Sequence, residues 1–134
     1  MYFVSREFSF SYGHRLYRYD GKCSRLHGHN ARVAIEIEGD SELNDQDMAI
    51  DFVRVKSTIG EWLEETFDHR VFLSKDDPLG PVLIEAGESP IFIDGNPTAE
   101  RLAQTIFDQA TELGLKVCRV DFWETSNCRA TYCR

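Results

Sequence analysis

An alternating run of residues from His27 to Glu38 restricts the fold of this chain more than any other feature. The inner face of this run is formed by its odd-numbered positions, His27, His29, Ala31, Val33, Ile35 and Ile37. A period of two residues is that of a β-strand, in which successive side chains point to opposite faces. The run therefore predicts a half-buried strand whose apolar face begins with two histidines. Gly39 and Asp40 close it.

Two other segments alternate in the same way, and both predict strands. Residues 117–125 form the later one. The earlier one, residues 8–14, carries on one face Phe8, Phe10, Tyr12 and His14. Between residues 70 and 95 the chain is punctuated by proline and glycine, with short apolar runs at 82–84 and 91–93. We interpret this stretch as a third strand or hairpin with long loops.

Two helices are predicted from capping residues and helical spacing. Asp51 is a suitable N-cap for the first helix. Its buried side is expected to comprise Phe52, Val55, Ile59, Trp62, Leu63 and Phe67. Asn96-Pro97, a capping residue followed by proline, predicts the start of the second helix, and Gly114 its end. Its apolar stripe is expected to comprise Leu102, Ala103, Ile106, Ala110 and Leu113.

The order of these elements predicts an α+β fold, in which an antiparallel sheet carries helices on one face. A length of 134 residues suits one domain, so we expect residues 1–134 to form a single unit. The formal charge of −8 and the lack of a basic block argue against nucleic acid or an anionic membrane as partner. With no export signal at the N-terminus, we expect a cytoplasmic protein with reduced cysteines.

Three of the four histidines lie where they can meet. His27 and His29 share the inner face of one strand, and His14 lies on the inner face of another. Buried imidazoles without partners would be costly to desolvate. Three nitrogen ligands with an open fourth position are the arrangement of a catalytic zinc site. We therefore predict that the three bind Zn²⁺; the alternative is that His14 is an ordinary core histidine and the His-x-His pair a coincidence.

Cys23 lies four residues before His27, between Lys22 and Arg25. Nearby cations and a metal favour the thiolate, so Cys23 is a candidate base or nucleophile. A fourth zinc ligand and a small buried side chain are the alternatives. Asp68-His69 follows the first helix and could form an acid–base pair, although a histidine at a helix C-terminus is equally ordinary.

Glu124 shares the parity of Val120 and Phe122 in the last strand, so a carboxylate is predicted on an apolar face. Buried carboxylates are rare unless they are paired. The partner could be a ligand with adjacent N–H donors, such as the amino-pyrimidine edge of a guanine or pterin. A neighbouring arginine, or a strand end open to water, would explain the residue equally well.

The segments around these candidates resemble a known family. Cys23-Ser24-Arg25-Leu26-His27-Gly28-His29, preceded by Phe10-Ser11-Tyr12-Gly13-His14, is similar to the zinc motif of the 6-pyruvoyltetrahydropterin synthase / 6-carboxytetrahydropterin synthase family. The likeness continues in Ile50-Asp51-Phe52, Asp68-His69, Asn96-Pro97-Thr98-Ala99-Glu100 and Trp123-Glu124-Thr125. These blocks come in the family's order across nearly the whole chain.

The resemblance implies a fold and an assembly, the tunnelling fold. Each subunit would have a four-stranded antiparallel sheet with two helices on one face, and three subunits would close a barrel. Two trimers would stack into a hexamer, with active sites at subunit interfaces. The stretch between His69 and Pro97 is longer here than in short bacterial members, so we expect different loops near the pocket.

The resemblance also implies roles for the candidate residues. His14, His27 and His29 would hold zinc, which would bind the side-chain hydroxyls of the substrate, 7,8-dihydroneopterin triphosphate. Cys23 would accept a proton from the substrate. The residue after Cys23 is Ser24 where glycine is common in the family, a small change.

The remaining catalytic and binding roles are implied in the same way. Asp68 and His69, from a neighbouring subunit, would form a second acid–base element. Glu124 would complete the catalytic set and anchor the pterin through its N–H edge. Thr98 and Glu100 would help to position the pterin.

Two outcomes from the same triphosphate substrate occur in the family. One yields 6-pyruvoyltetrahydropterin for tetrahydrobiopterin, and the other also releases acetaldehyde and yields 6-carboxytetrahydropterin for queuosine and other 7-deazapurines. A short chain that opens directly into its first strand is more similar to the carboxy-forming type, which we expect here. Two other classes compete: a non-catalytic zinc-binding assembly module with Cys23 as fourth ligand, and a zinc hydrolase that would not need Cys23.

Overall fold

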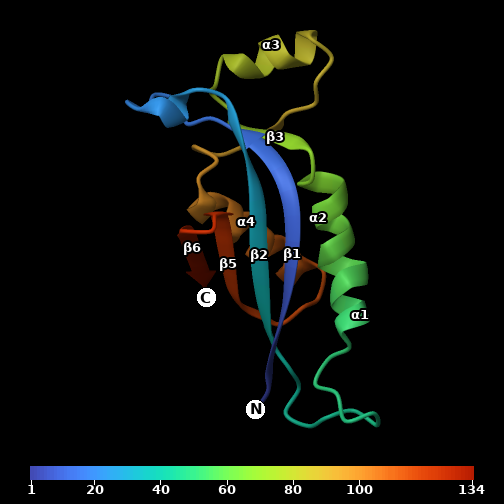
Figure 1. Cartoon of the computed structure of the whole chain (residues 1–134). Helices are drawn as coiled ribbons and strands as arrows, with labels where there is room; N and C mark the ends of the chain where they lie inside the picture. The colour runs from blue at the N-terminus through green and yellow to red at the C-terminus, as the bar shows by residue number, and fades with distance from the viewer.

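The computed structural model describes residues 1–134 and contains one mixed sheet of six strands (Figure 1). Its elements in chain order are β1 (Phe3–His14), η1 (Lys22–Ser24), β2 (His27–Glu38), α1 (Phe52–Val55), η2 (Lys56–Gly60), α2 (Glu61–Thr66), β3 (Arg70–Ser74), α3 (Leu79–Glu85), β4 (Ile91–Ile93), α4 (Ala99–Glu112), β5 (Val117–Thr125) and β6 (Cys128–Cys133). The strand order is β4-β3-β1-β2-β5-β6. An α+β fold is confirmed.

The two longest strands, β1 and β2, form the centre of the sheet. They pair antiparallel over all twelve residues of each, from Phe3 opposite Glu38 to His14 opposite His27. The alternation read from the sequence therefore matches the observed faces. The apolar inner residues of β2, from Ala31 to Ile37, are buried and His27 and His29 are half-buried, whereas Arg32 on the outer face is exposed.

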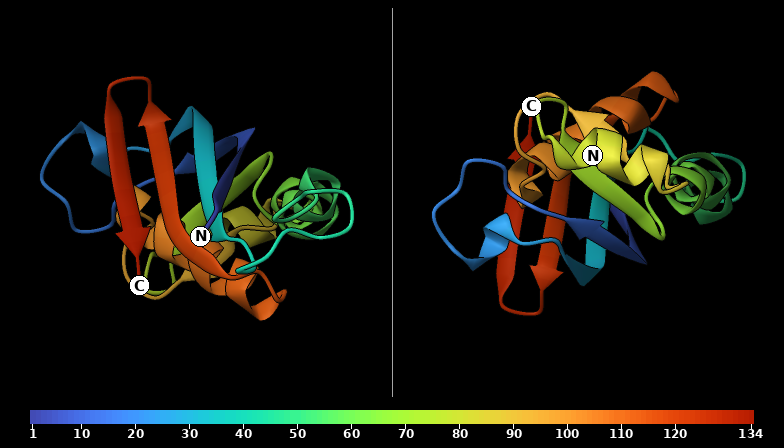
Figure 2. Two further views of the ribbon diagram at one scale, coloured as in Figure 1. Left: turned by 90° about the horizontal axis from the view of Figure 1, so that it is seen from below. Right: turned by 90° about the horizontal axis from the view of Figure 1, so that it is seen from above.

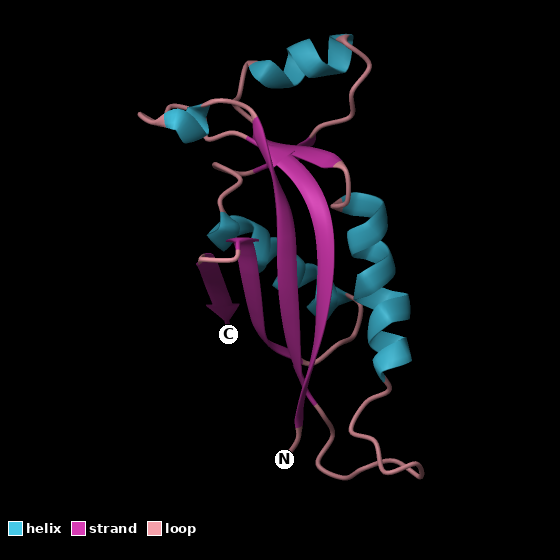
Figure 3. Cartoon of the chain, viewed as in Figure 1, coloured by secondary structure: helices cyan, strands magenta, loops and turns pink.

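All the long helical segments cover the same face of the sheet. Figure 2 shows the strands in a row with α4 on one side, and Figure 3 shows the run α1–η2–α2 lying along β1. The run α1–η2–α2 and helix α4 contribute to one hydrophobic core. The helical residues and the residue after α2 in this core include Val55, Ile59, Leu63, Phe67, Leu102, Ile106 and Ala110. The predicted placement of two helices on one face is thus confirmed. None of the helices has both the length and the apolar character that a membrane crossing requires.

The first helical segment begins as predicted but is less regular. The Asp51 carboxylate accepts a hydrogen bond from the amide of Val53 at 2.8 Å, which satisfies one free N–H of the first turn. Residues 56–60 form a π-helical turn. A side chain at Gly60 would meet the ring of Phe8 at 2.7 Å, so glycine lets the helix approach β1 closely here. Phe52, predicted on the buried side, is 49% exposed because it lies in the first turn, beyond the sheet contact.

The second helix begins two residues later than Asn96-Pro97 predicts. Thr98 is the N-cap and accepts from the amide of Arg101 at 3.3 Å. Asn96 does not cap the helix, because its amide group pairs instead with the backbone N–H and C=O of Tyr17. At the other end Gly114 has a φ of +85°, as expected for a residue that ends a helix. Leu113 is 38% exposed and not part of the buried stripe.

The predicted sheet of four antiparallel strands differs from the structure, in which the sheet has six strands and is mixed. The antiparallel strands are β1, β2, β5 and β6, and β3 and β4 add to the β1 side in parallel. Residues 82–84, read as a possible strand, belong to α3. Residues 91–93 do form a strand, β4. The last strand, residues 128–133, was missed because it is short, and most of its side chains are exposed.

A buried ion pair fastens the β3–α3–β4 segment to the end of β1. Asp77 is 2% exposed and accepts a two-pronged hydrogen bond from Arg15, the residue after His14. The same carboxylate accepts from the amide of Leu79 at 2.8 Å. Hydrogen bonds from Arg15 lower the pKa of Asp77 and outweigh the opposing effect of burial. The loop between β3 and α3 is therefore tied directly to the residue that follows His14, a candidate metal ligand.

We predict that Asp77→Asn lowers the free energy of unfolding at pH 7 by about 1–3 kcal/mol, because Arg15 loses a charged partner. The pKa of Asp77 is lower in the folded than in the unfolded chain. Its contribution is therefore complete above the unfolded value of about 4 and is lost as the pH falls through the lower folded value. Urea unfolding of both chains at pH 7 and at pH 3 checks this.

Asp76→Asn is the matched control, since Asp76 is exposed and has no ion-pair partner. An equal loss of unfolding free energy in both variants would contradict the role of the Asp77–Arg15 ion pair. So would a loss in Asp77→Asn that is larger at pH 3 than at pH 7.

Candidate active site

Three imidazole rings meet at one end of the sheet. The β1–β2 register places His14 opposite His27, and His29 lies on the same face two residues further along β2. The ring centroids lie 4.6 Å apart for His14 and His27, 5.1 Å for His14 and His29, and 5.0 Å for His27 and His29. One nitrogen from each ring lies within 4.8 Å of the other two. The convergence predicted from parity is confirmed.

Backbone carbonyls fix which ring nitrogen faces the shared space. The Nδ1 of His14 lies 2.7 Å from the carbonyl oxygen of Pro97, and the Nδ1 of His27 lies 2.6 Å from that of Arg25. A carbonyl oxygen can only accept, so each Nδ1 must carry the hydrogen. The Nε2 of both rings is thereby left with a free lone pair. Outer hydrogen bonds of this kind hold the ligating histidines in most metal sites.

The Nε2 of His14 is buried and has no hydrogen-bond partner. Burial lowers the pKa of His14, and although the Pro97 carbonyl and Glu124 oppose this effect, the net shift is downward. Burial likewise lowers the pKa of His29. Neutral imidazoles with a free lone pair are the form that binds a metal. An unpaired buried nitrogen is costly by itself, and a cation among the three rings would remove that cost.

Most of the predicted site residues line one pocket of about 340 Å³. Besides the three histidines, its walls include Cys23 from η1, Thr98 and Glu100 from the start of α4, and Glu124 from β5. Cys23 is not among the side chains whose ligand atoms cluster within 4.8 Å. The cysteine is thus placed at the pocket without closing the coordination of the three histidines. That position suits a base or nucleophile better than a fourth ligand.

Glu124 faces the histidines from the far end of β5. Its Oε1 lies 3.8 Å from the Nε2 of His14 and accepts a hydrogen bond from the hydroxyl of Tyr12 at 3.3 Å. The carboxylate side chain is 26% exposed and has no arginine or lysine partner. The alternative of a neighbouring arginine is therefore wrong. A half-buried carboxylate that borders a pocket without a cationic partner is available to N–H donors of a ligand.

Tyr12 was not singled out from the sequence as a site residue. It lies two residues before His14 on the same face of β1, so its parity already indicated a position beside the histidines. Burial, with a further effect of the Glu124 carboxylate, raises the pKa of Tyr12, which keeps the phenol protonated. The contact of the Pro97 carbonyl with His14 was also not predicted, because every residue has a backbone carbonyl and the sequence does not indicate which one accepts from a side chain.

Asp68 and His69 form a pair but lie outside this pocket. The Nδ1 of His69 is 2.9 Å from the Oδ1 of Asp68, and the same oxygen accepts from the amide of Ser11 at 3.0 Å. The Ser11 amide is the first reason that the pKa of Asp68 is lowered, and His69 adds to it. The imidazole of His69 is 81% exposed, and its backbone φ of +58° is unusual for a residue other than glycine. The pair therefore lies outside the pocket that the three histidines share, although His69 borders a separate pocket whose lining includes His27 and His29.

Comparison with known proteins gives consistent matches. The family model described as 6-pyruvoyl tetrahydropterin synthase matches residues 3–134. The chain is 32% identical to the 6-carboxy-5,6,7,8-tetrahydropterin synthase of Aquifex aeolicus, over 96% of each chain. It is 39% identical to a probable 6-carboxy-5,6,7,8-tetrahydropterin synthase of Halobacterium salinarum, over 71% of this chain and 60% of that one.

Solved structures with the same fold include an uncharacterized protein from Wolinella succinogenes, with a TM-score of 0.81, 26% identity and coverage of 99% of this chain and 98% of that one. The 6-pyruvoyl tetrahydropterin synthase of Caenorhabditis elegans has a TM-score of 0.74 at 23% identity, over 99% of this chain and 95% of that one. The likeness spans the whole fold and includes the strands that carry the three histidines. This chain belongs to the 6-pyruvoyl tetrahydropterin synthase family.

Proposed function

We propose that this protein is a zinc-dependent lyase that converts 7,8-dihydroneopterin triphosphate to 6-carboxy-5,6,7,8-tetrahydropterin. The observation that carries the proposal is the combination of three converging histidines, Cys23 and Glu124 around one pocket. The name of the Aquifex relative, which matches along nearly the whole chain, supports the carboxy-forming outcome.

The histidines fit zinc because of the donor set that they present. They offer three nitrogens and no fourth protein ligand at the same distance, which is typical of catalytic rather than structural zinc. Bound zinc would supply Lewis acidity toward the side-chain hydroxyls of the substrate. The Pro97 and Arg25 carbonyls would keep His14 and His27 in the ligating tautomer.

Cys23 would accept a proton from the side chain of the substrate, while Glu124 would bind the N–H edge of the pterin ring. The loop that carries Cys23 suits an anionic substrate, although the protein as a whole has a net charge of −8. Arg18, Lys22 and Arg25 are exposed, and none of them has an acidic partner. Free cations beside the pocket would favour approach of a triphosphate.

The two outcomes in the family differ by one water molecule. Elimination of triphosphate and proton shifts leave a side chain with two adjacent carbonyl groups, the pyruvoyl form. Addition of water across the bond between these carbonyls would give a carboxyl group on the ring and acetaldehyde, so that all atoms balance. Acetaldehyde is therefore the product that separates the two outcomes.

We predict that the purified zinc-loaded protein, given 7,8-dihydroneopterin triphosphate, forms triphosphate, acetaldehyde and 6-carboxytetrahydropterin in equal amounts. Mass spectrometry of the pterin and an aldehyde-trapping assay measure them. Triphosphate without acetaldehyde would assign the pyruvoyl-forming reaction instead. No consumption of the substrate would overturn the proposed function.

We predict that Cys23→Ala abolishes product formation while zinc content stays at one ion per chain, because Cys23 acts on the substrate and not on the metal. His27→Ala should lose both zinc and product, since it removes one of only three protein ligands. Metal analysis and the product assay on the same preparations check this. Cys133→Ala, at an exposed cysteine outside the pocket, is the matched control. Normal turnover in Cys23→Ala would contradict the mechanism.

We also propose that the active protein is an oligomer in which trimers close a barrel and two trimers stack. β6 has no neighbour beyond it in the sheet, and β1 pairs with β3 only over Tyr12–His14. Most of the outer edge of β1 is thus an unpaired strand edge, of the kind that strands from another chain can extend.

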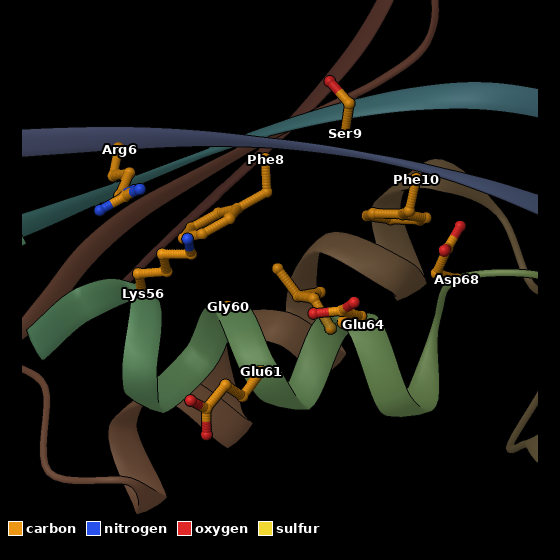
Figure 4. Close-up of a pocket in the computed structure, with 10 residues that line it drawn as sticks. Arg6, Phe8, Ser9, Phe10, Lys56, Gly60, Glu61, Glu64 and Asp68 are labelled. Atoms are coloured by element: carbon orange, nitrogen blue, oxygen red, sulfur yellow. The ribbon is translucent and has the colours of Figure 1, made fainter. Parts of the chain in front are cut away.

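The free edge of β1 borders a groove that ends at Asp68. Figure 4 shows this groove between β1 and the first helical segment, with Phe8 and Phe10 above the helix and Asp68 at one end. Its volume is about 250 Å³. A neighbouring chain paired with β1 would lie beside Asp68 and His69. The pair could then serve a pocket of the neighbour, which would explain why it is absent from the pocket of its own chain.

A mixing experiment tests this shared site. Cys23→Ala and His69→Ala should each be inactive alone. Co-expressed with two different tags and purified as hybrids, they should regain a substantial part of wild-type activity, because some sites then combine intact Cys23 with intact His69. Hybrids without activity, at normal zinc content and normal oligomeric size, would place both residues in the same chain's site.

A further inference from the structure

A buried tyrosine lies directly behind the candidate pocket. Tyr12 is 3% exposed, and its ring packs edge-on against Phe72 and Phe122, with centroids at 6.1 and 5.7 Å. The ring also contacts the imidazoles of two histidines of the site, His14 and His29, with centroids at 5.0 and 5.6 Å. Its surroundings are therefore apolar on one side and formed by the metal-site histidines on the other.

The hydroxyl of Tyr12 has one partner, the Oε1 of Glu124, at 3.3 Å. A buried phenol needs a hydrogen-bond partner, so this contact is required by the tyrosine itself. The two residues are distant in sequence, on β1 and β5, and β2 lies between these strands. The hydrogen bond thus joins the strand that carries His14 to the strand that carries the pterin-binding candidate.

We propose that Tyr12 is a positioning residue that fixes the Glu124 carboxylate for the ligand. The hydrogen bond occupies Oε1 and leaves Oε2 free for N–H donors in the pocket. This inference rests on the proposed function, because it assumes that Glu124 binds the amino-pyrimidine edge of a pterin.

The position of the carboxylate makes such a restraint useful. Oε1 lies 3.8 Å from the Nε2 of His14, the nitrogen that would bind the metal. A carboxylate so close to a three-histidine site could rotate toward the metal and become its fourth ligand, which would close the site. A hydrogen bond from a rigid, buried ring opposes that rotation. By holding Oε1 of Glu124, Tyr12 therefore both orients the carboxylate for the pterin and keeps it out of the open coordination position.

A conservative variant tests the proposal. Tyr12→Phe keeps the ring and removes only the hydroxyl. We expect zinc content and melting temperature to stay near wild type, because the variant removes one buried polar group and no packing. The Kd for the fluorescent heterocycle pterin should rise about tenfold, the lower end of the effect of losing an outer hydrogen-bond partner. Tyr132→Phe is the matched control, since the Tyr132 hydroxyl contacts Arg134 and lies outside the pocket.

A double-mutant cycle shows whether Tyr12 acts through Glu124. In a Glu124→Ala background, Tyr12→Phe should weaken pterin binding much less than in the wild type, because the acceptor that Tyr12 holds is gone. An equal loss in both backgrounds would mean that the Tyr12 hydroxyl does not act through Glu124, and unchanged binding in Tyr12→Phe would also overturn the proposal.

Two readouts separate this inference from the proposed function. Wild-type protein that binds no pterin and turns over no substrate would overturn the proposed function, and the inference with it. Wild-type protein that does both, beside a Tyr12→Phe variant with the same Kd, would overturn only the inference.

Discussion

The register between β1 and β2 is the constraint on which the rest of the molecule depends. It sets His14 opposite His27 and Tyr12 opposite His29, so the four rings share one face at the same end of the sheet. A slip of one residue would turn every side chain of one strand to the other face. The apolar residues Val33 and Ile35, both fully buried, oppose such a slip. The core that stabilises the fold therefore also holds the candidate metal site together.

The parts of the fold and site that could be predicted are those in which one residue follows a simple period. The faces of β1 and β2 follow from alternation, and from them the meeting of the three histidines. Asp51 and Gly114 mark helix ends because each satisfies a local backbone need. Glu124 stood out because a carboxylate on an apolar face needs a partner. Each of these inferences uses only the sequence within a few residues of the position concerned, together with the pairing of neighbouring strands.

The features that were missed depend on contacts between distant segments. Residues 82–84 are apolar enough for a strand, but helix or strand in so short a run is decided by the surrounding packing. Asn96 looks like a helix cap and is used instead to hold Tyr17. The Tyr12–Glu124 hydrogen bond joins residues 112 positions apart. The left-handed backbone at His69 is likewise something that a side-chain pattern does not indicate.

The strands bring the histidines together, but the loops decide what the histidines can bind. Carbonyl groups from Arg25, before β2, and Pro97, before α4, hold the hydrogen on Nδ1 of two rings. Without them either ring could present an N–H to the shared space, where it would repel a cation. Asn96 fastens the segment before α4 to the loop after β1, and Arg15 fastens the α3 segment to the same loop. The polar contacts of these loops thus serve the chemistry of the site, while the apolar sheet serves its position. This division explains why the sheet faces can be read from the sequence whereas the ligand tautomers cannot.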